Sequence, residues 1–196
     1  MSTEEYVARM TLNKELFARR IAEATITADE RQAFAGAPLR LLAITEDFCG
    51  DSAQFLPPLA RLAEELENVE LRFLLRDAQR ELASGYLRKD GYQAIPVIIA
   101  LDAEGNELGF LIERPERVYQ AFSDETRRFA GEHPELDGIS RTYDRMPDAT
   151  KQAVRANIDQ FRASRQDAWT RWLFEDLAEL VGRALASSRA QLDAAG

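Results

Sequence analysis

Cys49 is the only cysteine of the chain, and it stands where an apolar run gives way to the start of a predicted helix. The first N–H groups of a helix have no partner within the helix, and the positive end of the helix dipole lies there. Both features stabilise a thiolate, which is the nucleophilic form of cysteine. We therefore expect any covalent chemistry of this protein to begin at Cys49.

The residues around Cys49 are polar and acidic. Three carboxylates, Glu46, Asp47 and Asp51, lie within three positions of it and disfavour a second negative charge. Most free cysteines are small buried apolar residues without reactivity. The position at the polar end of an apolar run nevertheless favours a reactive thiol, because reactive sites of α/β sheets lie outside the carboxyl ends of strands.

Alternating strands and helices are predicted around this thiol. Two strand–helix–strand units joined by short loops predict parallel pairing through right-handed crossovers, and a final hairpin adds an antiparallel strand. The fold class is therefore α/β, with a central mixed sheet of about four strands flanked by helices. The apolar patterns place strands at residues 39–44, 69–75, 94–101 and 107–113, and helices at 50–67 and 79–86.

Helical additions are expected at both ends of the chain. Helical apolar spacing before residue 24 and the capping box Thr27-x-x-Glu30 predict short helices at the N-terminus. The chain beyond Pro115 is predicted to be helical, with an irregular segment at 131–147. The long helical segment that starts at residue 148 either breaks near Ser164 or protrudes. We divide the chain into an N-terminal helical addition (1–37), a core (38–130) and a C-terminal helical extension packed on the core (131–196).

The segment Phe48-Cys49-Gly50-Asp51-Ser52 resembles Trp-Cys-Gly-Pro-Cys, the active-site segment of the thioredoxin-like superfamily. Pro57 matches the proline inside the family's active-site helix, and Ile95-Pro96 resembles its cis-proline loop, which lies beside the nucleophile. Residues 45–52 and 74–77 look more closely like a bacterial subgroup called "thioredoxin family protein". The resemblance covers about residues 38–113 and implies a thioredoxin-like fold with the site between these two loops.

Two departures from the family pattern decide which chemistry the resemblance implies. Ser52 stands in the place of the resolving cysteine, so no intramolecular disulfide can form and a dithiol reductase is excluded. Ala43 stands in the place of a buried aspartate that manages protons for that second cysteine. What remains is monothiol exchange, in which Cys49 takes a small thiol from a mixed disulfide. Monothiol glutaredoxins and bacilliredoxins work in this manner, although their active-site sequences differ from this one.

The predicted site residues follow from this resemblance. Ser52 is either an ordinary residue of the helix start or a hydrogen-bond donor to the Cys49 sulfur. Arg76 is either half of a solvated pair with Asp77 or a residue that recognises substrate charge. We assign catalysis to Cys49 and Ser52, and substrate binding to Phe48, Gly50, Asp51, Arg76, Ile95 and Pro96.

Composition limits the partners. The net charge of −9 argues against nucleic acid and anionic membranes, and no apolar run approaches the ~20 residues that span a bilayer. No phosphate loop or metal-ligand cluster is apparent, and the sole histidine, His133, cannot form a metal site alone, so we expect no cofactor and no metal. A single cysteine without a secretory signal predicts a reducing cytoplasm.

Two classes of function remain open. The first is a monothiol thiol–disulfide oxidoreductase that acts on protein or small-molecule disulfides and is regenerated by an external low-molecular-weight thiol or reductase. The second is a non-catalytic thioredoxin-fold binding module, or a sensor that is trapped as a mixed disulfide at Cys49. A homodimer through the C-terminal helix is compatible with either function.

Overall fold

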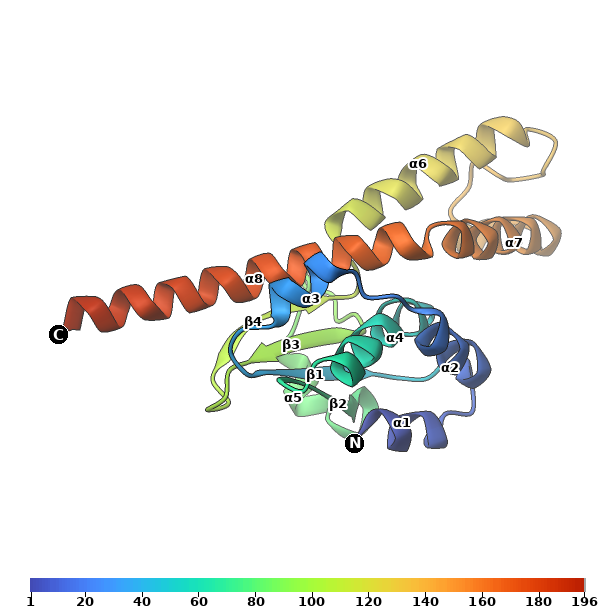
Figure 1. Ribbon diagram of the computed structural model, residues 1–196. Coiled ribbons are helices and arrows are strands. Elements are labelled where there is room, and N and C mark those ends of the chain that lie inside the picture. The colour runs from blue at the N-terminus through green and yellow to red at the C-terminus, as the bar shows by residue number, and fades with distance from the viewer. Residues whose placement is uncertain (196) are drawn as a thin grey trace. The chain divides into compact units, whose positions relative to one another are not determined.

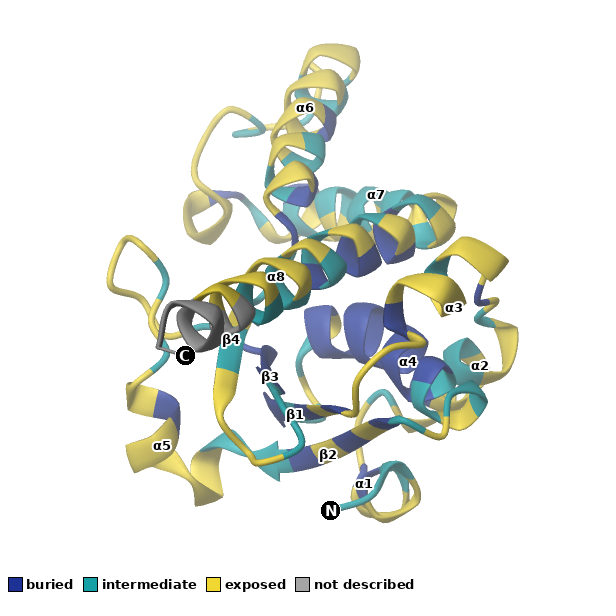
Figure 2. Cartoon of the chain, turned by 60° about the vertical axis from the view of Figure 1, so that its left-hand side comes forward, coloured by how far each residue is buried: buried dark blue, intermediate teal, exposed yellow. Residues whose placement is uncertain are grey.

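The computed structural model describes residues 1–195, including all side chains except those of residues 188, 189 and 191–195. Four strands form one mixed sheet in the order β2-β1-β3-β4 (Figure 1), which confirms the predicted α/β class. The two central strands and the helix that follows β1 are mostly buried (Figure 2). The strands are β1 (Leu39–Thr45), β2 (Val69–Leu75), β3 (Val97–Leu101) and β4 (Glu107–Ile112).

The direction of β3 differs from the prediction. Strands β1 and β2 are parallel as expected, but β3 runs antiparallel to β1, with Val97 opposite Ile44. The prediction of a second parallel unit was wrong because the intervening helix, α5 (Arg80–Ser84), has only five residues and makes no crossover. Strand β3 thus begins at the edge where β1 and β2 end, and this topology brings Pro96 to the edge that carries Cys49.

Three short helices precede the sheet: α1 (Thr3–Arg9), α2 (Lys14–Glu23) and α3 (Ala28–Phe34). The predicted capping box at Thr27 and Glu30 starts α3, and a second box at Ser2 starts α1. Three buried rings join the first two helices to β2, with the Tyr6 ring stacked on Phe73 at 4.5 Å and Phe17 edge-on to both. The N-terminal helices therefore share the core of the sheet.

Helix α4 (Gly50–Glu65) continues through Pro57 and Pro58. Because Pro57 has no N–H, the carbonyl of Ala53 lacks its usual donor four residues later in the helix. The Arg20 guanidinium of α2 donates to this carbonyl, with Nη1 at 2.7 Å from the oxygen. A side chain from the N-terminal helices thus repairs the backbone defect in the second turn of α4.

We expect Arg20→Met to lower the free energy of unfolding by about 1–3 kcal/mol, because it leaves a half-buried carbonyl without this donor. Urea denaturation followed by far-UV circular dichroism measures the change. Arg19→Met is the matched control, since Arg19 makes an exposed pair with Glu23 at 3.9 Å and its loss should cost less than about 0.5 kcal/mol. Equal effects of the two substitutions would contradict the assignment.

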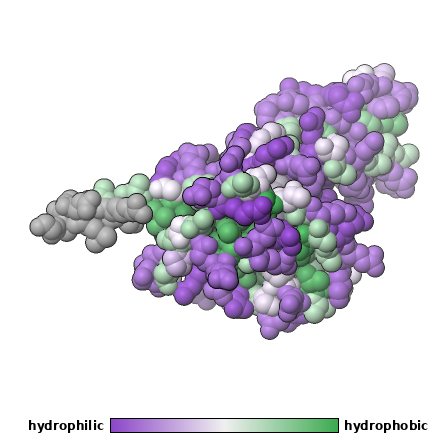
Figure 3. All heavy atoms as spheres, viewed as in Figure 1, coloured by the Kyte–Doolittle hydropathy of each residue, from purple (hydrophilic) through white to green (hydrophobic). Residues whose placement is uncertain are grey.

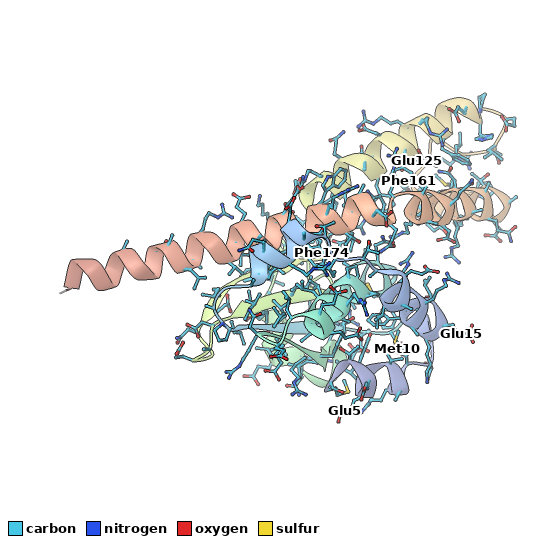
Figure 4. The ribbon with its side chains drawn as sticks, in the orientation of Figure 1. Glu5, Met10, Glu15, Glu125, Phe161 and Phe174 are labelled. Atoms are coloured by element: carbon cyan, nitrogen blue, oxygen red, sulfur yellow. The ribbon has the colours of Figure 1, made fainter. Side chains whose placement is uncertain are left out.

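The chain forms two compact units. One contains Met1–Pro115 and the chain from Thr170 onward, and the other is Glu116–Trp169. In the first unit, the C-terminal helix packs on α3 and on the sheet. The ring of Phe174, labelled in Figure 4, lies 6.0 Å from that of Phe34 in α3, and Leu180 packs against Gly109 of β4. The predicted boundaries at residues 37 and 130 stay predictions.

The second unit contains α6 (Glu116–Glu132), α7 (Asp148–Ser164) and the first residues of α8 (Gln166–Ala195). Of the two alternatives for the long C-terminal helix, the structure shows the break near Ser164, since α7 ends there. Glu125 on α6 accepts a hydrogen bond from Asn157 on α7 at 2.8 Å, and Phe122, Phe161 and Trp169 form an aromatic cluster (Figure 4).

The surface in the view of Figure 3 is mainly hydrophilic, with apolar side chains in patches among the charged ones. Within residues 1–195, no helix is long and apolar enough to cross a membrane.

Candidate active site

Cys49 is the N-cap residue of α4, and three residues separate it from the end of β1. The loop is closed by a hydrogen bond from the Cys49 N–H to the Glu46 carbonyl at 3.2 Å. The Sγ atom accepts the Ser52 N–H at 3.4 Å, as an N-cap side chain does. The structure therefore places the half-buried thiol at the helix start, where unpaired backbone N–H groups lie.

The sulfur has a second contact, on the loop before β3. The thiol donates to the Ile95 carbonyl, with 3.3 Å between Sγ and the oxygen, and the Ile95–Pro96 peptide bond is cis. The two contacts act in opposite directions, because the Ser52 N–H stabilises a thiolate whereas the Ile95 oxygen can bond only to the protonated thiol.

The Ser52 side chain is buried, with 1% of the residue exposed. Its backbone N–H contacts the Cys49 sulfur, whereas its hydroxyl has no hydrogen-bond partner among the residues that the structure describes. The hydroxyl bond to sulfur that we considered from the sequence is thus not formed in this state. A buried hydroxyl without a partner is uncommon, and it leaves an unused donor beside the helix start.

The three carboxylates near Cys49 are each held by a donor. Asp51 pairs with the Arg114 guanidinium at 2.5 Å, and Glu46 accepts the N–H of Asp77 at 2.8 Å. Asp47 accepts the N–H groups of Thr11 and Leu12, at 2.7 and 3.0 Å, and these bonds hold the pKa of its carboxyl below the usual range. The loop before Cys49 is thereby fastened to the connection between α1 and α2.

The lowered pKa of Asp47 predicts a dependence of stability on pH. Its carboxylate contributes stability above the unfolded pKa of about 3.9, and the contribution is lost as the pH falls through the lower folded value. We expect Asp47→Ala to reduce the free energy of unfolding by about 1 kcal/mol at pH 7, and by less at pH 3. Urea denaturation at both pH values measures this.

Glu67→Gln is the control for this pH dependence, because Glu67 is an exposed carboxylate in the same unit. A cost of Asp47→Ala that is the same at pH 3 and pH 7 would contradict the prediction.

Phe48 and Arg76 lie together at the same edge of the sheet. The Arg76 guanidinium carbon is 5.6 Å from the centre of the Phe48 ring, and 52% of Phe48 is exposed. Arg76 also pairs with Asp77 at 3.0 Å, as in the solvated-pair interpretation. Gly50 is exposed as the first residue of α4. The structure thus brings Arg76 to the loop that carries Cys49, although 27 positions separate the two residues in the chain.

Sequence reasoning missed the residues that follow β4. The Glu113 N–H donates to the Pro96 carbonyl at 2.7 Å, and the Glu113 carboxylate pairs with Arg114 and Arg88, each at 2.6 Å. The predicted hairpin could have revealed that Glu113 and Arg114 lie near Pro96, because the end of β4 returns to the start of its antiparallel neighbour β3. Among the described residues, no group of three or more His, Cys, Asp or Glu side chains could hold a metal ion.

Comparisons with known proteins agree with this architecture. An HIV epitope-scaffold of known crystal structure superposes with a TM-score of 0.56 at 19% identity, over 93% of this chain and 92% of the scaffold. A protein of unknown function from Pseudomonas aeruginosa, solved at 1.5 Å, superposes with a TM-score of 0.53 at 20% identity, over 81% of this chain and 92% of that one. At these identities the likeness concerns the fold alone.

No protein of curated function matches this sequence. The thioredoxin family model matches residues 1–127, which include the N-terminal helices, the Cys49 segment, the Pro96 loop and the whole sheet. This chain therefore belongs to the thioredoxin family.

Proposed function

We propose that this protein is a monothiol thiol–disulfide oxidoreductase that exchanges small thiols through Cys49. The observation that carries the proposal is the Cys49 sulfur itself, which accepts a backbone N–H at the start of α4 and lies against the loop of Pro96. Membership of the thioredoxin family supports thiol redox chemistry at this position. The single cysteine of the chain restricts that chemistry to one thiol.

The exchange needs two nucleophilic displacements. The Cys49 thiolate attacks the small-thiol sulfur of a protein–small-thiol disulfide, a new disulfide joins Cys49 to the small thiol, and the protein thiolate leaves and takes up a proton. A second low-molecular-weight thiolate then attacks the small-thiol sulfur of this adduct. The products are the Cys49 thiolate and a disulfide of two small thiols, so no net electrons are gained or lost by Cys49.

The side chains around the sulfur suggest how a disulfide would be held. Phe48 and Gly50, which flank Cys49 in the chain, are exposed, and the sulfur contacts the carbonyl of Ile95, the residue before Pro96. Arg76 offers a positive charge beside Phe48 for an anionic substrate group. Ser52 holds a buried hydroxyl that could donate to the thiolate after a side-chain rotation, and Asp51 contributes through its pair with Arg114.

A mass measurement tests this proposal. The reduced protein is incubated with oxidised glutathione, cystine or other oxidised small thiols, and we expect an adduct of one small thiol at Cys49. Addition of a second small thiol should release it and restore the starting mass. Absence of an adduct with every thiol, or rates no faster than those of a cysteine peptide, would overturn the proposal and favour the binding module.

The cellular setting is part of the same proposal. A monothiol that depends on external small thiols needs a reducing compartment, which points to the cytoplasm. The partners would be a disulfide substrate and a low-molecular-weight thiol or a reductase. Homodimer formation through the C-terminal helix stays a prediction, and size-exclusion chromatography with light scattering tests it.

A further inference from the structure

The ion pair between Asp51 and Arg114 is the best-shielded pair beside Cys49. The Asp51 and Arg114 side chains are only 9% and 15% exposed, and 2.5 Å separates the carboxylate oxygen from the guanidinium nitrogen. Asp51 lies two residues after Cys49, in the first turn of α4. Salt and water screen the charges of such a pair less than those of an exposed pair.

The backbone after β4 directs Arg114 toward α4. Glu113 has a left-handed conformation, with φ of 64°, that non-glycine residues adopt at a cost. Its N–H bonds to the Pro96 carbonyl, while its carboxylate pairs with Arg114 at 2.6 Å and with Arg88 at 2.6 Å. Arg114 is thus held between the loop of Pro96 and the start of α4, the two segments that contact the Cys49 sulfur.

The other titratable and charged groups around the sulfur do not pair with Asp51 in the contacts described above. The Glu46 and Asp47 carboxylates accept neutral N–H groups, and burial raises the pKa of the Tyr6 phenol to about 12, so the phenol is uncharged at neutral pH. The positive groups on neighbouring elements include Arg20, which donates to the Ala53 carbonyl, Arg76, which pairs with Asp77, and Arg114 and Arg88, which share Glu113. Of these contacts, the pair with Arg114 is the one that counters the carboxylate within α4 itself.

We propose that Arg114 is a positioning residue for the thiol chemistry. Its guanidinium balances the charge of the Asp51 carboxylate and so sets the pH range in which Cys49 reacts. The inference rests on the proposed function, because it concerns the reactivity of the same sulfur. Without Arg114, the Asp51 carboxylate would carry a less compensated negative charge beside the sulfur. A thiolate there would then be disfavoured.

The test is the pH dependence of alkylation at Cys49 by iodoacetamide, which needs no physiological substrate. We expect Arg114→Met to shift the midpoint of the rate profile upward by about one pH unit, so that the rate below the midpoint is about tenfold slower. Arg114→Lys keeps the positive charge, so its midpoint should stay close to that of the wild-type protein. Arg61→Met is the matched control, since Arg61 lies twelve residues along α4, about 18 Å from Cys49, and should leave the profile unchanged.

A double substitution distinguishes an effect of charge on the alkylation midpoint from an effect of altered structure. Asp51→Asn with Arg114→Met removes both charges, which is often neutral for folding, and should return the midpoint to its wild-type position. A midpoint unchanged in a folded Arg114→Met variant, or a double variant shifted as far as the single one, would overturn the inference.

The proposed function can fail separately from this inference. Adduct formation with small thiols tests the exchange reaction, whereas iodoacetamide tests only the thiol. A shifted alkylation profile without any adduct would leave Arg114 in its positioning role and remove the exchange activity. An adduct with an unshifted alkylation profile would support the exchange activity and overturn the positioning role of Arg114.

Discussion

Replacement of Cys49 by serine is expected to abolish small-thiol exchange and the mass adduct together. A serine hydroxyl does not ionise near neutral pH and cannot form a disulfide, so neither displacement can occur. The activity should fall by at least about a thousandfold, to the rate of the buffer thiols alone. Reduction of a protein–glutathione mixed disulfide, followed by mass spectrometry or a coupled assay, measures it.

Ser52→Ala is the matched control for this result. It keeps the sulfur and the backbone N–H that contacts it, and removes only the buried hydroxyl. We expect exchange to persist at no less than about a tenth of the wild-type rate, the scale of one lost hydrogen bond. Exchange that survives in the Cys49→Ser variant would show that the chemistry does not pass through this thiol.

Replacement of Phe73 by alanine is expected to lower the free energy of unfolding by about 3–5 kcal/mol. The Phe73 ring is fully buried, stacked on Tyr6 at 4.5 Å and edge-on to Phe17 at 6.3 Å. Its loss leaves a cavity between β2 and the first two helices, which cannot collapse without moving them. Urea denaturation followed by far-UV circular dichroism measures the change.

Tyr6→Phe is the control for this cluster, because it keeps the stacked ring and removes only a hydroxyl placed 3.4 Å from Thr45. Its cost should stay at about 1 kcal/mol or less. A Phe73→Ala variant that loses no more stability than this control would show that the N-terminal helices are not part of the core.

The family match agrees with that view of the N-terminal helices. It begins at residue 1, whereas the resemblance read from motifs began at about residue 38. The motifs could not reveal the earlier start, because residues such as Tyr6 and Phe17 carry a packing function that has no fixed sequence signature. Only their contact with Phe73 shows that the helices and the sheet form one core.

Local patterns predicted the strands well and their directions less well. The run Leu39–Ile44 and the alternation Val69–Leu75 gave β1 and β2 nearly to the residue, because buried strands need continuous or alternating apolar side chains. Strand β3 was predicted from residue 94 but begins at Val97, directly after Pro96, which has no N–H to give to a sheet. Its direction depended on the path of residues 76–96, which link β2 to β3 and whose course in space the sequence does not specify.

At the candidate site, too, some features follow from the sequence and others only from the tertiary structure. The sequence alone determined that any thiol chemistry of this chain is limited to one thiol at a helix start, since Cys49 has no second cysteine and local patterns place the helix. The tertiary structure decided which groups surround the sulfur: the Ile95 carbonyl, Arg76 against Phe48, and Arg114 on Asp51. These groups come from segments that lie 27 to 65 positions from Cys49 and meet it only because β2, β3 and β4 bring their ends to one edge of the sheet.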